Sequence, residues 1–132
     1  MFEQHNKLVR DRIPEIIKKK GDRLSIRILD DNVDYLRKVR EKIVEEAQEL
    51  LEAAYPTRVA DELIDILDLI DILSVELARR GITKAIFREL REEKNRKRGG
   101  FKKRIFLIET ESKPFATLWR GKGGEDASQK KR

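Results

Sequence analysis

Two pairs of acidic residues lie at helical spacing in the middle of this 132-residue sequence. Glu46 and Glu49 are three positions apart, and so are Glu62 and Asp65. Residues at i and i+3 share one face of a helix, with Cβ atoms about 5–6 Å apart, so each pair can offer two carboxylates to one ligand. Oxygen ligands suit Mg²⁺ and Mn²⁺, and a divalent-metal site is therefore the chemistry that these residues predict.

The composition excludes several other kinds of site. The sequence has no Cys and a single His, which rules out disulfide scaffolds, Cys-ligated zinc and His-rich metal sites. The alternative for the acids is an ordinary charged helix face, exposed to solvent or paired with Lys and Arg of another subunit. Two pairs, one of them on a helix that is apolar nearly all round, favour the metal site.

The elements that position these acids follow from the periodicity of the apolar residues. Apolar positions recur at helical spacing over 33–54 and 58–80, and residues 55–57 interrupt the pattern. Helices joined by a short turn pack antiparallel, so we expect both acid pairs to meet at similar depth. No Lys or Arg lies between Arg58 and Arg79, so a cation must reach the acids of the second helix from elsewhere.

Shorter elements flank this helical hairpin. We predict a helix over 12–20 that Asp11 can cap, and a third long helix that begins after the cap residue Thr83 and runs to about Arg98. Segments with strand-like patterns are 24–28 (a strand or an extended segment), 104–109 and 115–119. The expected fold class is all-α, an antiparallel helix bundle with a small C-terminal β element.

Charge is segregated along the chain, whose total is +6. Residues 41–76 carry eleven acidic and two basic residues, whereas 84–104 carry ten basic and three acidic ones. A protein that binds metal through its acids and phosphate through its bases has this distribution, although two ordinary surface faces would have it too. No run of about 18 apolar residues is present, so we expect no membrane-spanning helix.

The order of these features resembles a known superfamily. The pattern Glu-Glu-x-x-Glu at 45–49, followed after twelve residues by Glu-x-x-Asp at 62–65, resembles the all-α nucleoside triphosphate pyrophosphohydrolases. That group includes MazG, the dimeric dUTPases and phosphoribosyl-ATP pyrophosphohydrolase. NKLVRDRIPEII at 6–17 and REEKNRKRGGFKKRIFL at 91–107 are similar to its MazG-like branch, so the resemblance covers residues 6–108.

The resemblance implies Mg²⁺-dependent cleavage of a nucleoside triphosphate, with Mn²⁺ as a possible substitute, to a nucleoside monophosphate and pyrophosphate. The implied metal ligands are Glu46, Glu49, Glu62 and Asp65. The candidate catalytic residues are Glu49, which would orient or deprotonate the attacking water, and Glu45, whose different direction around the helix leaves its role open. The candidate substrate-binding residues are Lys7, Arg10, Lys94 and Arg98. Each of the last two has an alternative role, which is only to complement the C-terminal dipole of its helix.

We expect a MazG-like domain over 1–110, an extension over 111–120 and a disordered basic tail over 121–132. The expected protein is a cytoplasmic homodimer or homotetramer that cleans the nucleotide pool. Few Asn, Gln and Met beside many Lys, Glu and Arg are typical of a thermophile. The alternative is a non-catalytic oligomeric module that binds nucleic acid through its basic C-terminal segment, although nucleic acid is not the expected partner because the acidic segment would repel it.

Overall fold

The computed structural model describes residues 1–113, and within them the chain forms four helices and no strand. The helices are α1 (Ile13–Lys19), α2 (Asn32–Glu52), α3 (Pro56–Arg79) and α4 (Lys84–Arg98). This arrangement confirms the expected all-α fold class. A search of the same residues finds no helix with both the length and the apolar character needed to cross a membrane.

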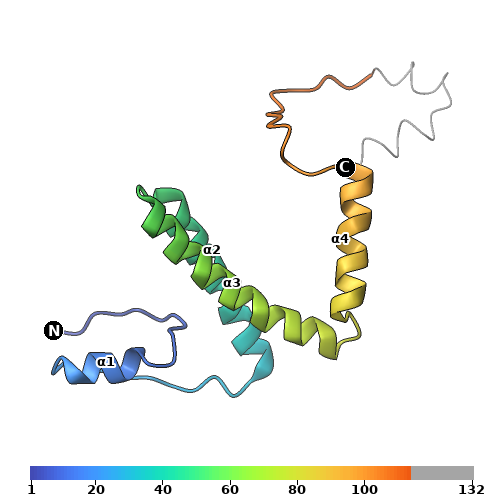
Figure 1. Ribbon diagram of the computed structural model, residues 1–132. Helices are drawn as coiled ribbons and strands as arrows, with labels where there is room; N and C mark the ends of the chain where they lie inside the picture. The colour runs from blue at the N-terminus through green and yellow to red at the C-terminus, as the bar shows by residue number, and fades with distance from the viewer. Residues whose placement is uncertain (114–132) are drawn as a thin grey trace. The chain divides into compact units, whose positions relative to one another are not determined.

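The hairpin of α2 and α3 is the part of the fold that positions the acids. Asp31 caps α2 by accepting a hydrogen bond from the backbone N–H of Val33 at 3.0 Å. Pro56 begins α3, where the missing N–H of proline leaves no helical bond unmade. The two helices run antiparallel and side by side, as Figure 1 shows, and theirs are the most numerous contacts between any two helices. The predicted meeting of two long helices across a short turn is therefore confirmed.

The predicted cap of α4 is confirmed, whereas the predicted cap of α1 is wrong. Thr83 caps α4 as predicted, because its hydroxyl accepts a hydrogen bond from the backbone N–H of Ile86 at 3.3 Å. Gly81 separates α3 from α4 with φ +99°, a left-handed conformation that glycine adopts without a steric penalty. The prediction that Asp11 caps α1 is wrong, since Arg12 holds the cap position and makes no side-chain cap bond.

The predicted C-terminal β element is absent from the described residues. Residues 104–109 carry the apolar run expected of a strand, but the described structure has no strand there. Residues 24–28 likewise form no strand, so the strand alternative for them is wrong. The strand candidate 115–119 and the basic tail 121–132 lie outside the described residues.

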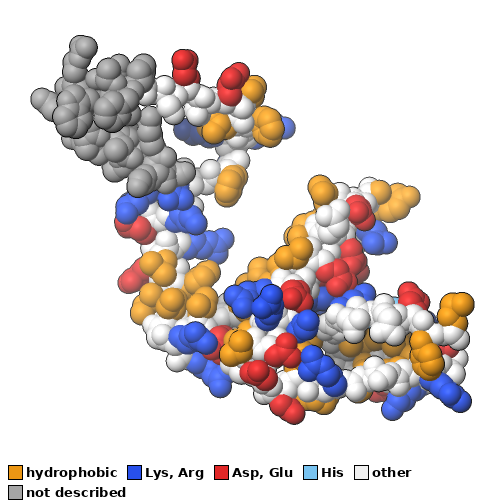
Figure 2. Space-filling view, turned by 180° about the vertical axis from the view of Figure 1, so that it is seen from behind, with side chains coloured by type: hydrophobic (Ala, Val, Ile, Leu, Met, Phe, Trp, Pro, Cys, Tyr) orange, Lys and Arg blue, Asp and Glu red, His pale blue; other side chains and the backbone are white. Residues whose placement is uncertain are grey.

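The chain divides into two compact units, Met1–Lys94 and Asn95–Arg132. Val39 and Leu69 are the only apolar side chains in residues 1–113 that are buried. Much of the apolar side of α3 is exposed, and hydrophobic side chains also cover the surface of the first turns of α4, whereas Lys and Arg cover its C-terminal end (Figure 2). A single chain thus buries little apolar surface.

Candidate metal centre

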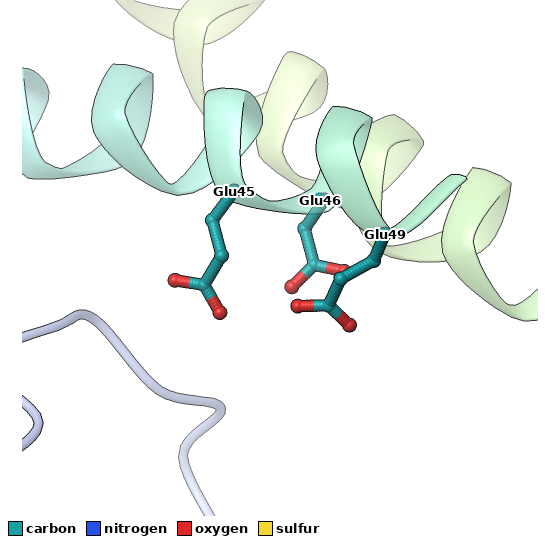
Figure 3. Close-up of side chains that lie close together, drawn as sticks. All are labelled: Glu45, Glu46 and Glu49. Carbon is teal, nitrogen blue, oxygen red and sulfur yellow. The ribbon is translucent and has the colours of Figure 1, made fainter. Parts of the chain in front are cut away.

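Five carboxylates from α2 and α3 form two overlapping clusters. Ligand oxygens of Glu46, Glu62 and Asp65 all lie within 4.8 Å of one another, and the same holds for Glu45, Glu46 and Glu49. Figure 3 shows that the last three project from the same side of α2. Glu46 belongs to both clusters, so the acids that the sequence analysis named from the two helices meet at this residue.

Two of these carboxylates are inside the hairpin rather than on its surface. Glu46 is 4 % exposed and Glu62 is 3 % exposed, and they are the two polar residues that are buried in residues 1–113. The Oε2 atom of each is buried and has no hydrogen-bond partner. Burying a carboxylate is unfavourable unless hydrogen bonds, ion pairs or a metal compensate it. Two buried oxygens are therefore left without a partner, and a nearby cation would compensate them.

The crowding changes the acidity of Glu46. Burial, together with hydrogen-bonding contact with Glu62 and Asp65 and repulsion by Glu49, raises the pKa of Glu46 from 4.5 to about 7. The pKa of Glu49 is also raised, first by burial and then by repulsion from Glu62 and Glu45. Both carboxyls therefore hold a proton more readily than an isolated glutamate, as expected where like charges share a site.

Glu45 differs from its neighbours because it has cationic partners. Its Oε2 atom accepts hydrogen bonds from the ammonium groups of Lys42 at 3.0 Å and Lys7 at 3.3 Å. Burial alone would raise the pKa of Glu45, but the two ammonium groups outweigh burial and hold this pKa below its ordinary value. Lys42 also lies 3.4 Å from Glu46. Glu45 is thus an ionised member of the cluster at neutral pH.

The N-terminal segment supplies a cation to α3. The guanidinium of Arg10 donates from Nε to Asp65 Oδ1 at 3.0 Å, and its Nη2 atom lies 2.9 Å from Asp68 Oδ2. Asp65 and Asp68 are three positions apart on α3, so one guanidinium bridges two carboxylates of one helix face. Arg10 is thus a cation from outside α3, as expected for Asp65 and Asp68. For Glu62 the expectation is wrong, because Arg58 of α3 itself lies 4.0 Å from its Oε1 atom.

Two of the predicted substrate-binding residues are not members of either carboxylate cluster. Two residues that were not predicted take part in its ion pairs. Lys94 and Arg98 are both in α4, and their contact with phosphate stays a prediction. Sequence reasoning missed Lys42 and Asp68. Lys42 could have been found from its spacing, since it precedes Glu45 by three and Glu46 by four positions on one helix. Asp68 gave no such signal, because its partner Arg10 is far away in the sequence.

The donor set fits a hard divalent cation. All the candidate ligands are carboxylates, and an all-oxygen set suits Mg²⁺ or Mn²⁺ better than zinc or copper, whose sites usually include imidazole or thiolate ligands. The unpartnered oxygens of Glu46 and Glu62 are the second observation in favour of this fit, because a buried carboxylate oxygen needs a cation or a donor. The cluster therefore has the chemistry and the unmet charge of a metal centre.

Comparison with known protein families places the middle of the chain in one of them. Residues 9–94 match the family model described as phosphoribosyl-ATP pyrophosphohydrolase. This range is more than half of the chain, and it contains all five clustered carboxylates as well as Arg10. Searches of curated proteins and of solved structures each returned no significant match.

Proposed function

This chain belongs to the phosphoribosyl-ATP pyrophosphohydrolase family, and from that premise we propose that it hydrolyses nucleoside triphosphates between the α and β phosphates. The products are a nucleoside monophosphate and pyrophosphate, formed with one water molecule. The substrates are noncanonical or surplus ribo- and deoxyribonucleotides, and the role is to clean the nucleotide pool of the cytoplasm.

One observation carries this proposal more than any other. Glu46 and Glu62 come from different helices, are almost fully buried, and leave one oxygen each without a partner beside Asp65. Burying such acids destabilises the folded protein unless a ligand compensates their charge. A divalent metal that brings a polyphosphate to the cluster is the ligand that satisfies this charge.

The proposed ligands of Mg²⁺ or Mn²⁺ are Glu46, Glu49, Glu62 and Asp65. When bound, the metal neutralises charge on the phosphate oxygens and lowers the pKa of a bound water molecule. Glu49, whose carboxylate lies within 4.8 Å of those of Glu45 and Glu46, is the proposed acceptor of a proton from the attacking water. Glu45 belongs to the same cluster and accepts hydrogen bonds from Lys42 and Lys7, so we assign it to orienting the same water.

The basic residues of the N-terminal segment are the proposed phosphate contacts. Lys7 and Arg10 both touch acids of the cluster, so both lie where a metal-bound polyphosphate would arrive. Lys94 and Arg98 are proposed to contact phosphate as well. Cationic groups around a polyphosphate stabilise the charge that develops on its bridging and terminal oxygens during hydrolysis.

The proposed assembly is a homodimer or homotetramer. Within residues 1–113 the buried apolar core consists of Val39 and Leu69, while large side chains of α3 such as Leu63, Ile64 and Leu67 are half exposed. Exposed apolar patches of this kind mark protein interfaces. A second copy of this chain, packed against α3, would complete the bundle.

The decisive experiment is phosphorus NMR of the reaction products. Purified protein is incubated with a panel of nucleotides that includes phosphoribosyl-ATP, in the presence of Mg²⁺ and in EDTA. We expect pyrophosphate and the monophosphate with Mg²⁺ only. Orthophosphate as the primary product, or no turnover of any nucleotide, would overturn the proposed function.

A further inference from the structure

Arg10 forms an ion pair with Asp65, which is also a proposed ligand of the metal centre. Its guanidinium binds Asp65 through Nε and Nη2, and both bonds end on the same Oδ1 atom. Asp65 is at the same time one of the three carboxylates whose oxygens lie within 4.8 Å of one another. A divalent ion held by Asp65 would therefore share one small carboxylate with a cationic side chain, and the two cations would repel each other.

Arg10 differs from the other cations at the cluster in the acid that it holds and in the element that it comes from. Lys7 also belongs to residues 1–12, but it contacts Glu45, which is not a proposed metal ligand. Lys42 belongs to α2, and its side chain is only 16 % exposed, so it stays beside Glu45 and Glu46. Arg58 belongs to α3 and lies 4.0 Å from Glu62. Arg10 instead comes from residues 1–12, which form no helix, and its side chain is 54 % exposed. Moving Arg10 off Asp65 disturbs no helix.

Asp68 gives the displaced guanidinium a place to remain. Asp68 is half exposed and is not among the residues of either carboxylate cluster, yet it lies 2.9 Å from Arg10 Nη2. It is one helical turn from Asp65 on the same face of α3. A guanidinium anchored by Asp68 alone keeps most of its N–H donors free, and donors in this planar fork match phosphate oxygens well.

We propose that Arg10 is a displaceable counter-ion: it neutralises Asp65 in the metal-free protein, retreats to Asp68 when a divalent metal takes Asp65, and then binds the nucleotide phosphate. This inference rests on the proposed function, because it needs a metal and a phosphate ligand at the cluster. It makes Arg10 a substrate-binding residue whose location reports whether the metal is bound. It also makes metal binding and nucleotide binding cooperative, since the first event frees the donor that serves the second.

The test is direct measurement of Mn²⁺ binding by calorimetry to the full chain without nucleotide. Arg10→Gln removes the competing cation and keeps a polar side chain of similar length. We expect it to bind Mn²⁺ about five-fold more tightly than the wild type or better, because the metal no longer displaces an ion pair. Its melting temperature in EDTA should fall, and its KM for the nucleotide should rise.

Matched variants separate this mechanism from a merely structural ion pair. Arg27→Gln breaks a comparable exposed pair with Asp34, away from the cluster, and should leave the Mn²⁺ affinity unchanged. Asp68→Asn should raise KM for the nucleotide, because the displaced guanidinium loses its anchor, and should not weaken Mn²⁺ binding. If Arg10→Gln does not fold, Arg10→Lys keeps the charge with a poorer bridge, and its Mn²⁺ affinity should exceed that of the wild type by a smaller factor.

The outcomes distinguish the two proposals. If the wild type binds Mn²⁺ and Arg10→Gln binds it equally or less tightly, Arg10 is a structural partner of Asp65 and the counter-ion mechanism is wrong, while the proposed function stands. If the wild type binds no Mn²⁺ at millimolar concentration, the metal centre itself is wrong and both proposals fail with it.

Discussion

Glu46 of α2 and Glu62 of α3 meet inside the helical hairpin, and each leaves its Oε2 atom buried without a hydrogen-bond partner. Lys42 lies 3.4 Å from Glu46 and Arg58 lies 4.0 Å from Glu62, so each carboxylate has one cation near its other oxygen. The pair is therefore only half compensated. Its metal-free state stores an unfavourable charge that binding of a cation would relieve.

Neutralising Glu46 should stabilise the metal-free protein. In Glu46→Gln the shape is kept and one buried charge is lost, so we expect a gain of about 1–3 kcal/mol in the free energy of unfolding near pH 8. The same variant should lose most of the stabilisation by Mg²⁺, which for a native-state ligand is about 2.7 kcal/mol at 100 times the dissociation constant. Urea unfolding in EDTA and in excess Mg²⁺ measures both effects.

Glu41→Gln is the matched control for this substitution. Glu41 lies one turn before Glu45 on α2, but it is exposed and pairs with Arg37 and Lys38 on the surface. It should change the stability by less than about 0.5 kcal/mol and keep the full Mg²⁺ effect. An equal loss of the Mg²⁺ effect in both variants would mean that general acidity, rather than the cluster, attracts the metal.

The metal-free protein should lose stability as the pH rises from about 4.5 to about 7. The pKa of Glu46 is raised to about 7 in the folded protein, so over this range the folded state holds a proton that the unfolded state has released. Stability falls with pH wherever the folded state binds more protons, here by up to about 3 kcal/mol. Glu49, whose pKa is also raised, acts in the same direction.

Two other acids change the stability in the opposite direction, and they do so over a different pH range. The pKa values of Glu45 and Glu76 are lowered, so the stability that they contribute is lost only as the pH falls below their ordinary value of 4.5. Thermal melting across this pH range in EDTA tests the prediction. Glu46→Gln should flatten most of the slope, and a slope unchanged by that substitution would assign it to other groups.

Asp65→Asn should separate metal binding from crowding. Asp65 already has Arg10 as a partner, so its neutralisation should not stabilise the metal-free protein as that of Glu46 does. Turnover should fall by more than the about 10–100-fold that loss of an outer-shell partner typically costs, because a proposed ligand is removed. The Mg²⁺ shift of the melting temperature should shrink in parallel. A wild-type shift with normal turnover would exclude Asp65 from the ligand set.

Lys94→Ala and Arg98→Ala test the basic residues of α4. If they contact phosphate, turnover should fall by about ten-fold or more, whereas the melting temperature should fall by only a few degrees. If they only complement the dipole of α4, turnover at saturating substrate should persist and the melting temperature alone should drop slightly. Steady-state kinetics and thermal melting on the same preparations decide between the two roles.

Leu67→Asp should dissociate the proposed oligomer. Leu67 is 58 % exposed on α3, so a charge there meets water in a monomer and an apolar partner in an assembly. We expect a smaller mass in analytical ultracentrifugation and a lower melting temperature. Glu41→Gln again serves as the control on an exposed position outside this face. An unchanged mass would place the subunit interface elsewhere.

The sequence was sufficient to predict α2 and α3, because the periodicity of their apolar residues is a local property of the chain. The apolar repeat placed α2 and α3 to within two residues, and the i, i+3 spacing identified the acids that meet at Glu46. The strand expected over 104–109 is not observed, because an apolar run shows a preference for burial and does not by itself specify strand pairing. Asp11 failed as a cap for a similar reason: several polar residues precede α1, and the backbone decides which one lies at its end.

The partners of the acids depended on tertiary structure. That Asp65 and Asp68 need a cation from outside α3 follows from the spacing of Arg58 and Arg79, but the choice of Arg10 depends on the path of the N-terminal segment. The sequence also could not show which carboxylate has the most strongly raised pKa, since Glu46 and Glu49 look equivalent in it. Burial between α2 and α3, which is a property of the packed hairpin, separates them.

The sparse interior of the chain has a calorimetric consequence. The heat capacity of unfolding grows with the apolar surface that becomes hydrated, and Val39 and Leu69 are the only buried apolar residues of the described part. An isolated chain would thus melt with a small heat-capacity change and a broad, weakly cooperative transition. If copies of the chain cover α3, most of the heat-capacity change belongs to their separation, and the melting temperature rises with protein concentration.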